Sequence, residues 1–203
     1  MHNRLNFEKR SAIKDFAKDI DSVSNVFEIG SRHSLDLKKL VHFKSNKKDI
    51  KYIEFKKLLK EEFNGCELMI CIDSLCYLSG STWEEILGYY IKKSDYSIII
   101  NPMWMVGHNS LDFKRYGEEW YLSNVPLNKS ESYIKKWFAN HNSFDHSTNK
   151  FIKDSYGVWQ TGITEADLKN KLDSLGCKVI KQYYLGVNNK PWIHNMAYLI
   201  KKV

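Results

Sequence analysis

An acid and a glycine in a short apolar segment, residues 26–30, are the first side chains whose types and spacing suggest chemistry. Glu28 lies inside this segment and Gly30 ends it. A glycine lets the backbone approach a ligand closely, and the N-terminus of the helix expected next presents unpaired N–H groups to an anionic group. Ser31 and Arg32 follow, and an arginine here could clamp a carboxylate through two parallel hydrogen bonds, although a surface role is more common. The turn is therefore a candidate ligand site.

A second candidate site follows residues 68–72, which are continuously apolar and typical of a central parallel strand buried on both faces. Asp73 and Ser74 come directly after them. Ligands of open α/β sheets bind at the carboxyl ends of strands, so both side chains are candidates for contact with a ligand. The alternative is that Asp73 begins a turn and bonds its own backbone, and the sequence favours neither interpretation.

A candidate general base follows a third apolar segment, residues 96–100. His108 lies a few residues beyond it, where an imidazole near the edge of a sheet could remove a proton from a hydroxyl group. A structural or exposed role is the more common one for a histidine in a loop. His141 and His146 lack the i, i+4 spacing of a helical pair of metal ligands, so we expect no metal site there.

Strand and helix patterns alternate along the chain, and these elements must hold the candidate residues. Ile13, Phe16, Ala17 and Ile20 share one face of a leading helix within residues 1–23. The expected strands are residues 26–30, 49–55, 68–72 and 96–100. Alternation of this kind is typical of a parallel sheet with right-handed crossovers. We therefore expect residues 68–72 and 97–100 to form adjacent parallel strands at the centre of the sheet.

Two later helices carry start signals. Thr82 is the expected N-cap of a helix that continues to residue 91, and Glu85 is its partner in a capping box. Thr164 is the expected N-cap of a second helix, which Gly176 ends. Two closing strands are expected at residues 178–184 and 196–200.

Periodicity fades between residues 103 and 159, where Trp, Tyr, Asn, Ser and His are frequent. We expect an insertion over the edge of the sheet, with one short helix near residues 133–138. Its aromatic side chains could wall a ligand pocket, although packing the insertion onto the sheet is their more common use.

Composition limits the classes of protein to consider. The chain has 203 residues, of which 43% are hydrophobic and 27% charged, so it can bury one sizeable core and is expected to form a single domain. The net charge of +7 permits a nucleic-acid partner, but the lysines are dispersed and the pattern does not favour one. We expect no membrane span, a cytoplasmic location, and buried thiols at the four cysteines, which lack the C-x-x-C spacing of zinc sites.

Three segments, in this order, resemble the class I S-adenosylmethionine-dependent methyltransferases: residues 26–32, 67–78 and 160–179. The resemblance covers roughly residues 24 to 203, by the succession of strands and helices. It implies an α/β, Rossmann-like methyltransferase fold, in which a central, mostly parallel sheet carries helices on both faces. It also implies that residues 103–159 are an insertion after the family's fifth strand, covering the acceptor site.

The resemblance implies S-adenosylmethionine as the cofactor and assigns residues to it. Glu28, Gly30, Ser31 and Arg32 correspond to the cofactor turn, and Asp73 and Ser74 lie near the cofactor or the acceptor. Residues 49–55 are either the family's second strand, which makes Glu54 the ribose-binding acid, or its third, which leaves no such acid. We favour the third. His108 is the candidate base.

The function implied is methyl transfer to a small-molecule or sugar-like acceptor. Two alternatives stay open. One is an RNA methyltransferase, which the positive charge permits. The other is a non-enzymatic binding module that has kept the fold and lost the cofactor, because Arg32 and Ser34 stand where the family pattern has glycines.

Overall fold

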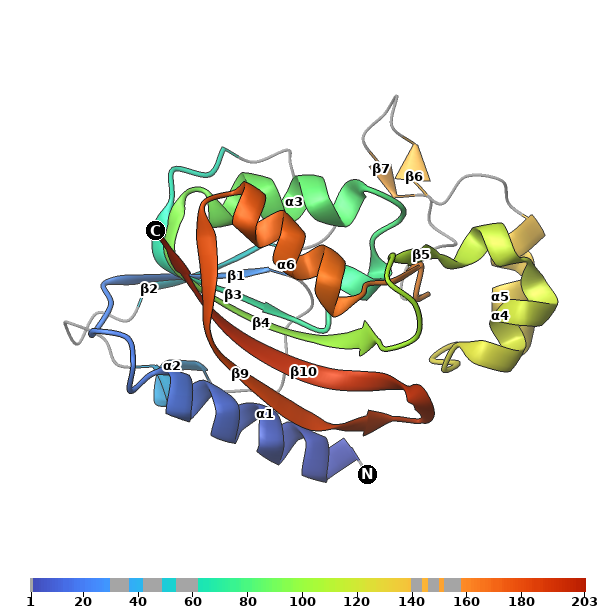
Figure 1. Ribbon diagram of the computed structural model, residues 1–203, viewed down its shortest axis with the longest axis horizontal. Helices are drawn as coiled ribbons and strands as arrows, with labels where there is room; N and C mark the ends of the chain where they lie inside the picture. The colour runs from blue at the N-terminus through green and yellow to red at the C-terminus, as the bar shows by residue number, and fades with distance from the viewer. Residues whose placement is uncertain are drawn as a thin grey trace.

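A six-stranded sheet with the order β2-β1-β3-β4-β10-β9 organises the computed structural model (Figure 1). The structure describes residues 2–29, 37–41, 49–53, 62–139, 144–145, 150–151 and 158–203. The strands of this sheet are β1 (Asn25–Ile29), β2 (Asp49–Ile53), β3 (Cys66–Ile72), β4 (Ser94–Trp104), β9 (Cys177–Asn188) and β10 (Lys190–Lys202). Strands β2, β1, β3 and β4 are parallel to one another, whereas β10 is antiparallel to both β4 and β9.

The centre of the sheet is the parallel pair of β3 and β4, in which Ile72 lies opposite Ile100. Residues 68–72 and 98–100 are all buried. Apolar side chains on both faces of a strand are stable only where helices cover both faces, as crossovers in a parallel sheet require. The expectation of two adjacent parallel strands at the centre is confirmed.

Strand β2 pairs directly with β1, on the side away from β3. In a doubly wound sheet of order 3-2-1-4-5, the neighbour of the first strand on that side is the second strand. Our preference for residues 49–55 as the family's third strand is therefore wrong. The number of residues between two strands does not reveal which edge of the sheet a strand joins. Glu54 is the next residue along the chain and lies outside the described residues.

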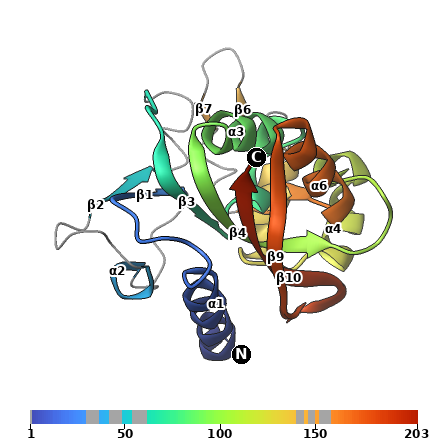
Figure 2. The same ribbon diagram turned by 60° about the vertical axis from the view of Figure 1, so that its left-hand side comes forward.

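Helices cover both faces of the sheet (Figure 2). One face is covered by α1 (His2–Phe16), whose Ile13 and Phe16 pack with Ile70 and Ile72 of β3. The opposite face is covered by α3 (Thr82–Ile91) and α6 (Glu165–Ser174). The short helix α2 (Leu37–Leu40) lies beside α1. The expected leading helix is confirmed, although it ends at Phe16 and the chain continues as a turn.

The start of α3 differs from the expectation. Ser81, not Thr82, is at the N-cap position, and its side chain makes no capping hydrogen bond. Ser81 already has helical dihedral angles (φ −78°, ψ −5°), and its carbonyl accepts the N–H groups of Glu84 and Glu85 at 2.9 and 3.2 Å. A capping side chain needs an extended backbone at the cap. Thr82 is therefore a buried residue of the first turn, and the capping box is wrong.

Helix α6 begins and ends as expected. Thr164 has an extended backbone (φ −85°, ψ 154°), and its hydroxyl accepts the N–H of Asp167 at 3.2 Å. Gly176 follows the helix with φ +68°, the left-handed conformation that glycine adopts without a steric cost. The chain then enters β9, and the expected pair of closing strands is confirmed as the hairpin of β9 and β10.

The segment between β4 and α6 contains several short elements. They are β5 (Leu111–Asp112), η3 (Phe113–Tyr116), α4 (Glu118–Asn124), α5 (Glu131–Ala139), β6 (Phe144–Asp145), β7 (Lys150–Phe151) and β8 (Thr161–Gly162). Helix α5 confirms the short helix expected near residues 133–138. Figure 1 shows α4 and α5 beyond the carboxyl end of β4. This segment therefore extends from the edge of the sheet where the candidate residues lie.

Candidate active site at the carboxyl edge of the sheet

The carboxyl ends of β1 and β3 meet at the switch point of the sheet. Ile29, the last residue of β1, lies opposite Cys71, and β3 ends one residue later at Ile72. From β1 the chain order runs outward to β2 on one side and to β3 and β4 on the other. Open α/β sheets bind ligands at such a reversal, outside the carboxyl ends of the strands. The residues that follow Ile29 and Ile72 are therefore placed where a ligand is expected.

Asp73 occupies this place in an unusual backbone conformation. Its φ is +48°, and only Asn189, at the tip of the β9–β10 hairpin, is another non-glycine with positive φ among the described residues. The Asp73 N–H donates to the carbonyl of Ile100 at 2.7 Å, which holds the residue against β4. Its side chain is 29% exposed, so the carboxylate can be reached from outside.

Lys9 of α1 forms an ion pair with the Asp73 carboxylate, and its ammonium donates a hydrogen bond to Oδ2. The Lys9 side chain is only 5% exposed. Lysine is almost never buried to this extent unless its charge is paired. Lys9 is not among the residues predicted from the sequence, although a signal is present: Lys9 precedes Ile13 by four residues and thus shares the buried face of the leading helix.

Ser74 is fully buried and holds the two strand ends together. Its hydroxyl lies 2.6 Å from the carbonyl of Ile72 and 3.2 Å from the carbonyl of Ile29. A hydroxyl occupied in this way orients the edge of the sheet rather than facing a ligand. Glu28 is also buried, at 9% exposure, and lies opposite Ile70 in the register of β1 and β3.

Two buried thiols lie close to these acids. Burial raises the pKa of Cys71 to about 12, with smaller contributions from the charges of Asp73 and Glu28. Burial likewise raises the pKa of Cys76 well above its usual value. Since the thiolate is the reactive form of cysteine, both groups are inert at neutral pH. The expectation of buried thiols is confirmed for Cys71, Cys76 and Cys177, whereas Cys66 is half-buried.

His108 lies away from this cluster. Ile100 of β4 lies opposite Ile72, and β4 continues for four more residues to Trp104. Four residues of extended chain span about 13 Å. His108 follows in an exposed loop, where its backbone carbonyl accepts the hydroxyl of Thr164 at 3.2 Å. This hydrogen bond holds the loop at the start of α6, and His108 does not contact Asp73.

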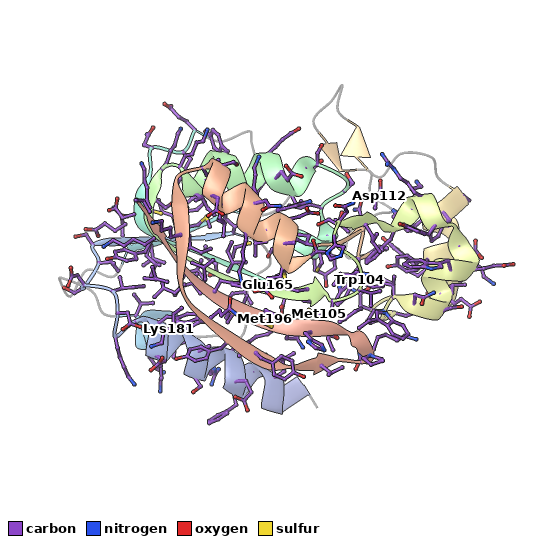
Figure 3. The ribbon with its side chains drawn as sticks, in the orientation of Figure 1. Trp104, Met105, Asp112, Glu165, Lys181 and Met196 are labelled. Carbon is purple, nitrogen blue, oxygen red and sulfur yellow. The ribbon has the colours of Figure 1, made fainter. Side chains whose placement is uncertain are left out.

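Aromatic side chains pack the segment between β4 and α6 into a core of its own. Figure 3 shows Trp104 at the end of β4, with Asp112 of β5 and Glu165 of α6 in the same region. The Trp104 ring lies 5.3 Å from that of Phe113 and 5.9 Å from that of Trp120, between ring centroids. Packing is thus the observed use of these residues.

Several candidate residues lie outside the described part of the chain. They are Gly30, Ser31, Arg32, Ser34, Glu54, His141 and His146. Within the described residues, no group of three or more His, Cys, Asp and Glu side chains is placed to hold a metal ion. No described helix is long and apolar enough to cross a membrane.

No family model and none of the curated proteins matches the sequence, so the comparisons rest on solved structures. The N-terminal domain of EvdMO1, crystallised with SAH and D-fucose, is 10% identical with a TM-score of 0.55, over 96% of this chain and 82% of that one. The N-methyltransferase NodS from Bradyrhizobium japonicum WM9 is 10% identical with a TM-score of 0.53, over 98% and 97%. A proposed Zn-dependent alcohol dehydrogenase from Rhodobacter sphaeroides is 10% identical with a TM-score of 0.56, over 94% and 88%.

Identities this low show the fold alone. The neighbours share a Rossmann-like arrangement with the present chain along nearly its whole length. The adjacent parallel strands β3 and β4, the helices on both faces of the sheet and the pair of closing strands agree with the expectation from the sequence. The chain has the Rossmann-like fold of the class I S-adenosylmethionine-dependent methyltransferases.

Proposed function

We propose that the protein transfers a methyl group from S-adenosylmethionine to a small-molecule or sugar-like acceptor. The observation that carries this proposal is the charged cluster at the switch point, where the accessible carboxylate of Asp73 lies beside the ammonium of Lys9. Among the solved neighbours, the EvdMO1 domain is described with SAH bound, and this supports the choice of cofactor.

The residues present fit the chemistry of this cofactor. S-adenosylmethionine carries an α-ammonium, an α-carboxylate and ribose hydroxyls, and it supplies an electrophilic methyl group when bound. The Asp73 carboxylate is able to accept hydrogen bonds from an ammonium or a hydroxyl, and the Lys9 ammonium is able to donate to a carboxylate. In our proposal Glu28 of β1 and the following Gly30, Ser31 and Arg32 bind the cofactor, and Glu54 follows the second strand as the ribose-binding acid.

The chain's own part in the reaction is to position the two reactants. Transfer of a methyl group from a sulfonium is an in-line displacement, so alignment of the acceptor supplies much of the rate. We place the acceptor at the carboxyl edge, on the side covered by the segment between β4 and α6. We leave His108 out of the catalytic proposal, because its loop is exposed and tied to Thr164.

The first experiment is calorimetric titration of the protein with S-adenosylmethionine and with its product S-adenosylhomocysteine. Both are expected to bind. Gly30→Val should abolish this binding and leave the far-UV circular dichroism unchanged, because a side chain at Gly30 would intrude on the ligand.

Gly88→Val is the matched control on α3. An added carbon at Gly88 meets Leu175 and Lys171 at ordinary contact distances of 3.6 and 3.8 Å, so this variant should still bind. If the unmodified protein shows no heat of binding even at millimolar ligand, the proposal fails. The non-enzymatic module then becomes the better explanation of the fold.

A further inference from the structure

The ion pair of Lys9 and Asp73 joins two parts of the chain that are far apart in sequence. Lys9 lies in α1, whereas Asp73 ends the central strand β3, 64 residues later. The resemblance to the methyltransferases begins near residue 24, so it assigns no role to Lys9. The position of this lysine at the carboxyl edge is known only from the folded structure.

Stability alone is a weak explanation for such a pair. Removing two charges from water costs free energy that their attraction often fails to recover, so apolar residues in the same place frequently give equal or greater stability. Asp73 also adopts a left-handed φ of +48°, a conformation that is unfavourable for most residues other than glycine and occurs often at ligand-binding sites. An unusual backbone conformation and a buried ammonium coincide at one point of the expected ligand site.

Both groups retain hydrogen-bonding capacity. The Lys9 ammonium has three donors, and within the described residues its only hydrogen bond is to Oδ2 of Asp73. Oδ1 of Asp73 accepts no hydrogen bond from a described residue. Within the described residues the pair therefore has two unused donors next to an unused carboxylate oxygen, and Asp73 is partly exposed.

We propose that this pair binds the zwitterionic amino-acid end of the cofactor. The Lys9 ammonium donates to the α-carboxylate, and the Asp73 carboxylate accepts from the α-ammonium, so that four charges alternate in sign. Neither protein group has to leave the other when the ligand binds. The inference rests on the proposed function and makes α1 part of the cofactor site.

The test compares two ligands that differ in the amino-acid end. S-adenosylhomocysteine carries the α-ammonium and the α-carboxylate, whereas 5′-methylthioadenosine lacks both. Lys9→Met should weaken the binding of S-adenosylhomocysteine about tenfold to a hundredfold, the range for one charge-assisted hydrogen bond. The affinity for 5′-methylthioadenosine should not change. Lys14→Met is the matched control, because Lys14 is an exposed lysine of the same helix, and it should change neither affinity.

The outcomes separate this inference from the proposed function. If Lys9→Met weakens the binding of both ligands equally, Lys9 has only a structural role and the inference is overturned, although the protein still binds the cofactor. If the unmodified protein binds neither ligand, both ideas fall. If Lys9→Met does not fold, the inference is tested with the unmodified protein, by measuring its affinity for the α-carboxamide of S-adenosylhomocysteine. That ligand should bind at least tenfold more weakly than the carboxylate, and equal affinity would overturn the inference.

Discussion

The ion pair at the switch point predicts that its two halves differ in their contribution to stability. Asp73→Asn removes the negative charge and keeps the size of the side chain. Asparagine also tolerates the left-handed φ of +48° at this position, so the backbone should not change. The perturbation therefore isolates the charge, and it leaves Lys9 with a buried ammonium that has no counter-charge.

The expected loss of stability in each variant follows from the exposed fraction of the two side chains. Removing one partner of a fully buried pair costs about 3–5 kcal/mol, and the 29% exposure of Asp73 lets water reach the pair, so we expect about 2–3 kcal/mol for Asp73→Asn. Lys9→Met keeps the packing of an unbranched chain and leaves behind the accessible carboxylate, which water can solvate. Its cost should be about 1 kcal/mol or less.

The assay is equilibrium unfolding in urea, followed by circular dichroism, for both single variants and the double variant. When methionine replaces Lys9, Asp73→Asn no longer leaves an unpaired buried charge. The double variant should therefore be more stable than Asp73→Asn alone. The coupling energy should then be about 2–3 kcal/mol, close to the whole cost of Asp73→Asn alone. Strictly additive costs, or an Asp73→Asn variant as stable as the unmodified protein, would refute the reasoning.

Three further predictions concern stability. Thr164→Ala should lower the free energy of unfolding by about 1 kcal/mol, measured in urea, because the N–H of Asp167 loses its cap. Burial raises the pKa of Cys71 to about 12, so the stabilisation by its neutral thiol is complete below the unfolded-state pKa of 9.0 and declines above it. The free energy of unfolding, measured in urea, should therefore fall by roughly 1.4 kcal/mol for this thiol between about pH 8 and 10, and less steeply in Cys71→Ala. Gly162→Ala should cost about 1–3 kcal/mol, since the new carbon would lie 2.8 Å from the buried ring of Phe113, and an unchanged melting temperature would contradict this packing.

The elements that could be predicted are those whose signals are local. Residues 68–72 are continuously apolar because both faces of β3 are covered, and the sequence therefore indicates a central strand without knowledge of its neighbours. Thr164 and Gly176 mark the ends of α6 for the same reason, since a cap and a left-handed turn involve only adjacent residues. Local chemistry decides these features, and the sequence contains all of it.

The features that were missed depend on contacts between distant residues or on one dihedral angle. Thr82 has the right type for a cap, but the helical backbone of Ser81 moves the first hydrogen bonds one residue earlier. The place of β2 depends on which edge of β1 it joins, and nothing within residues 49–53 records that choice. Lys9 lies on the buried face of the leading helix, but the sequence does not identify its partner, which is 64 residues away.

Helix α1 is fixed at two points, and this explains how a helix at the start of the chain can contribute to the site. Its C-terminal half is held to β9, where Lys181 lies 2.6 Å from Asp15 and 2.8 Å from Asp19, and the rings of Phe16 and Tyr183 stack. The Lys181 ammonium and the Tyr183 hydroxyl hold the pKa of Asp15 well below its usual range, so the carboxylate keeps its charge well into acidic pH.

Lys9 connects the N-terminal half of α1 to the carboxyl edge of the sheet. A rigid helix with one end anchored on the closing hairpin places a side chain two turns away within a narrow region, because each turn advances the chain by about 5.4 Å. Asp73 lies in that region, at the end of a strand that the core holds on both faces. The hairpin and the central strand thus determine jointly where the ammonium lies, and the geometry of the Lys9–Asp73 pair is a property of the fold rather than of the helix alone.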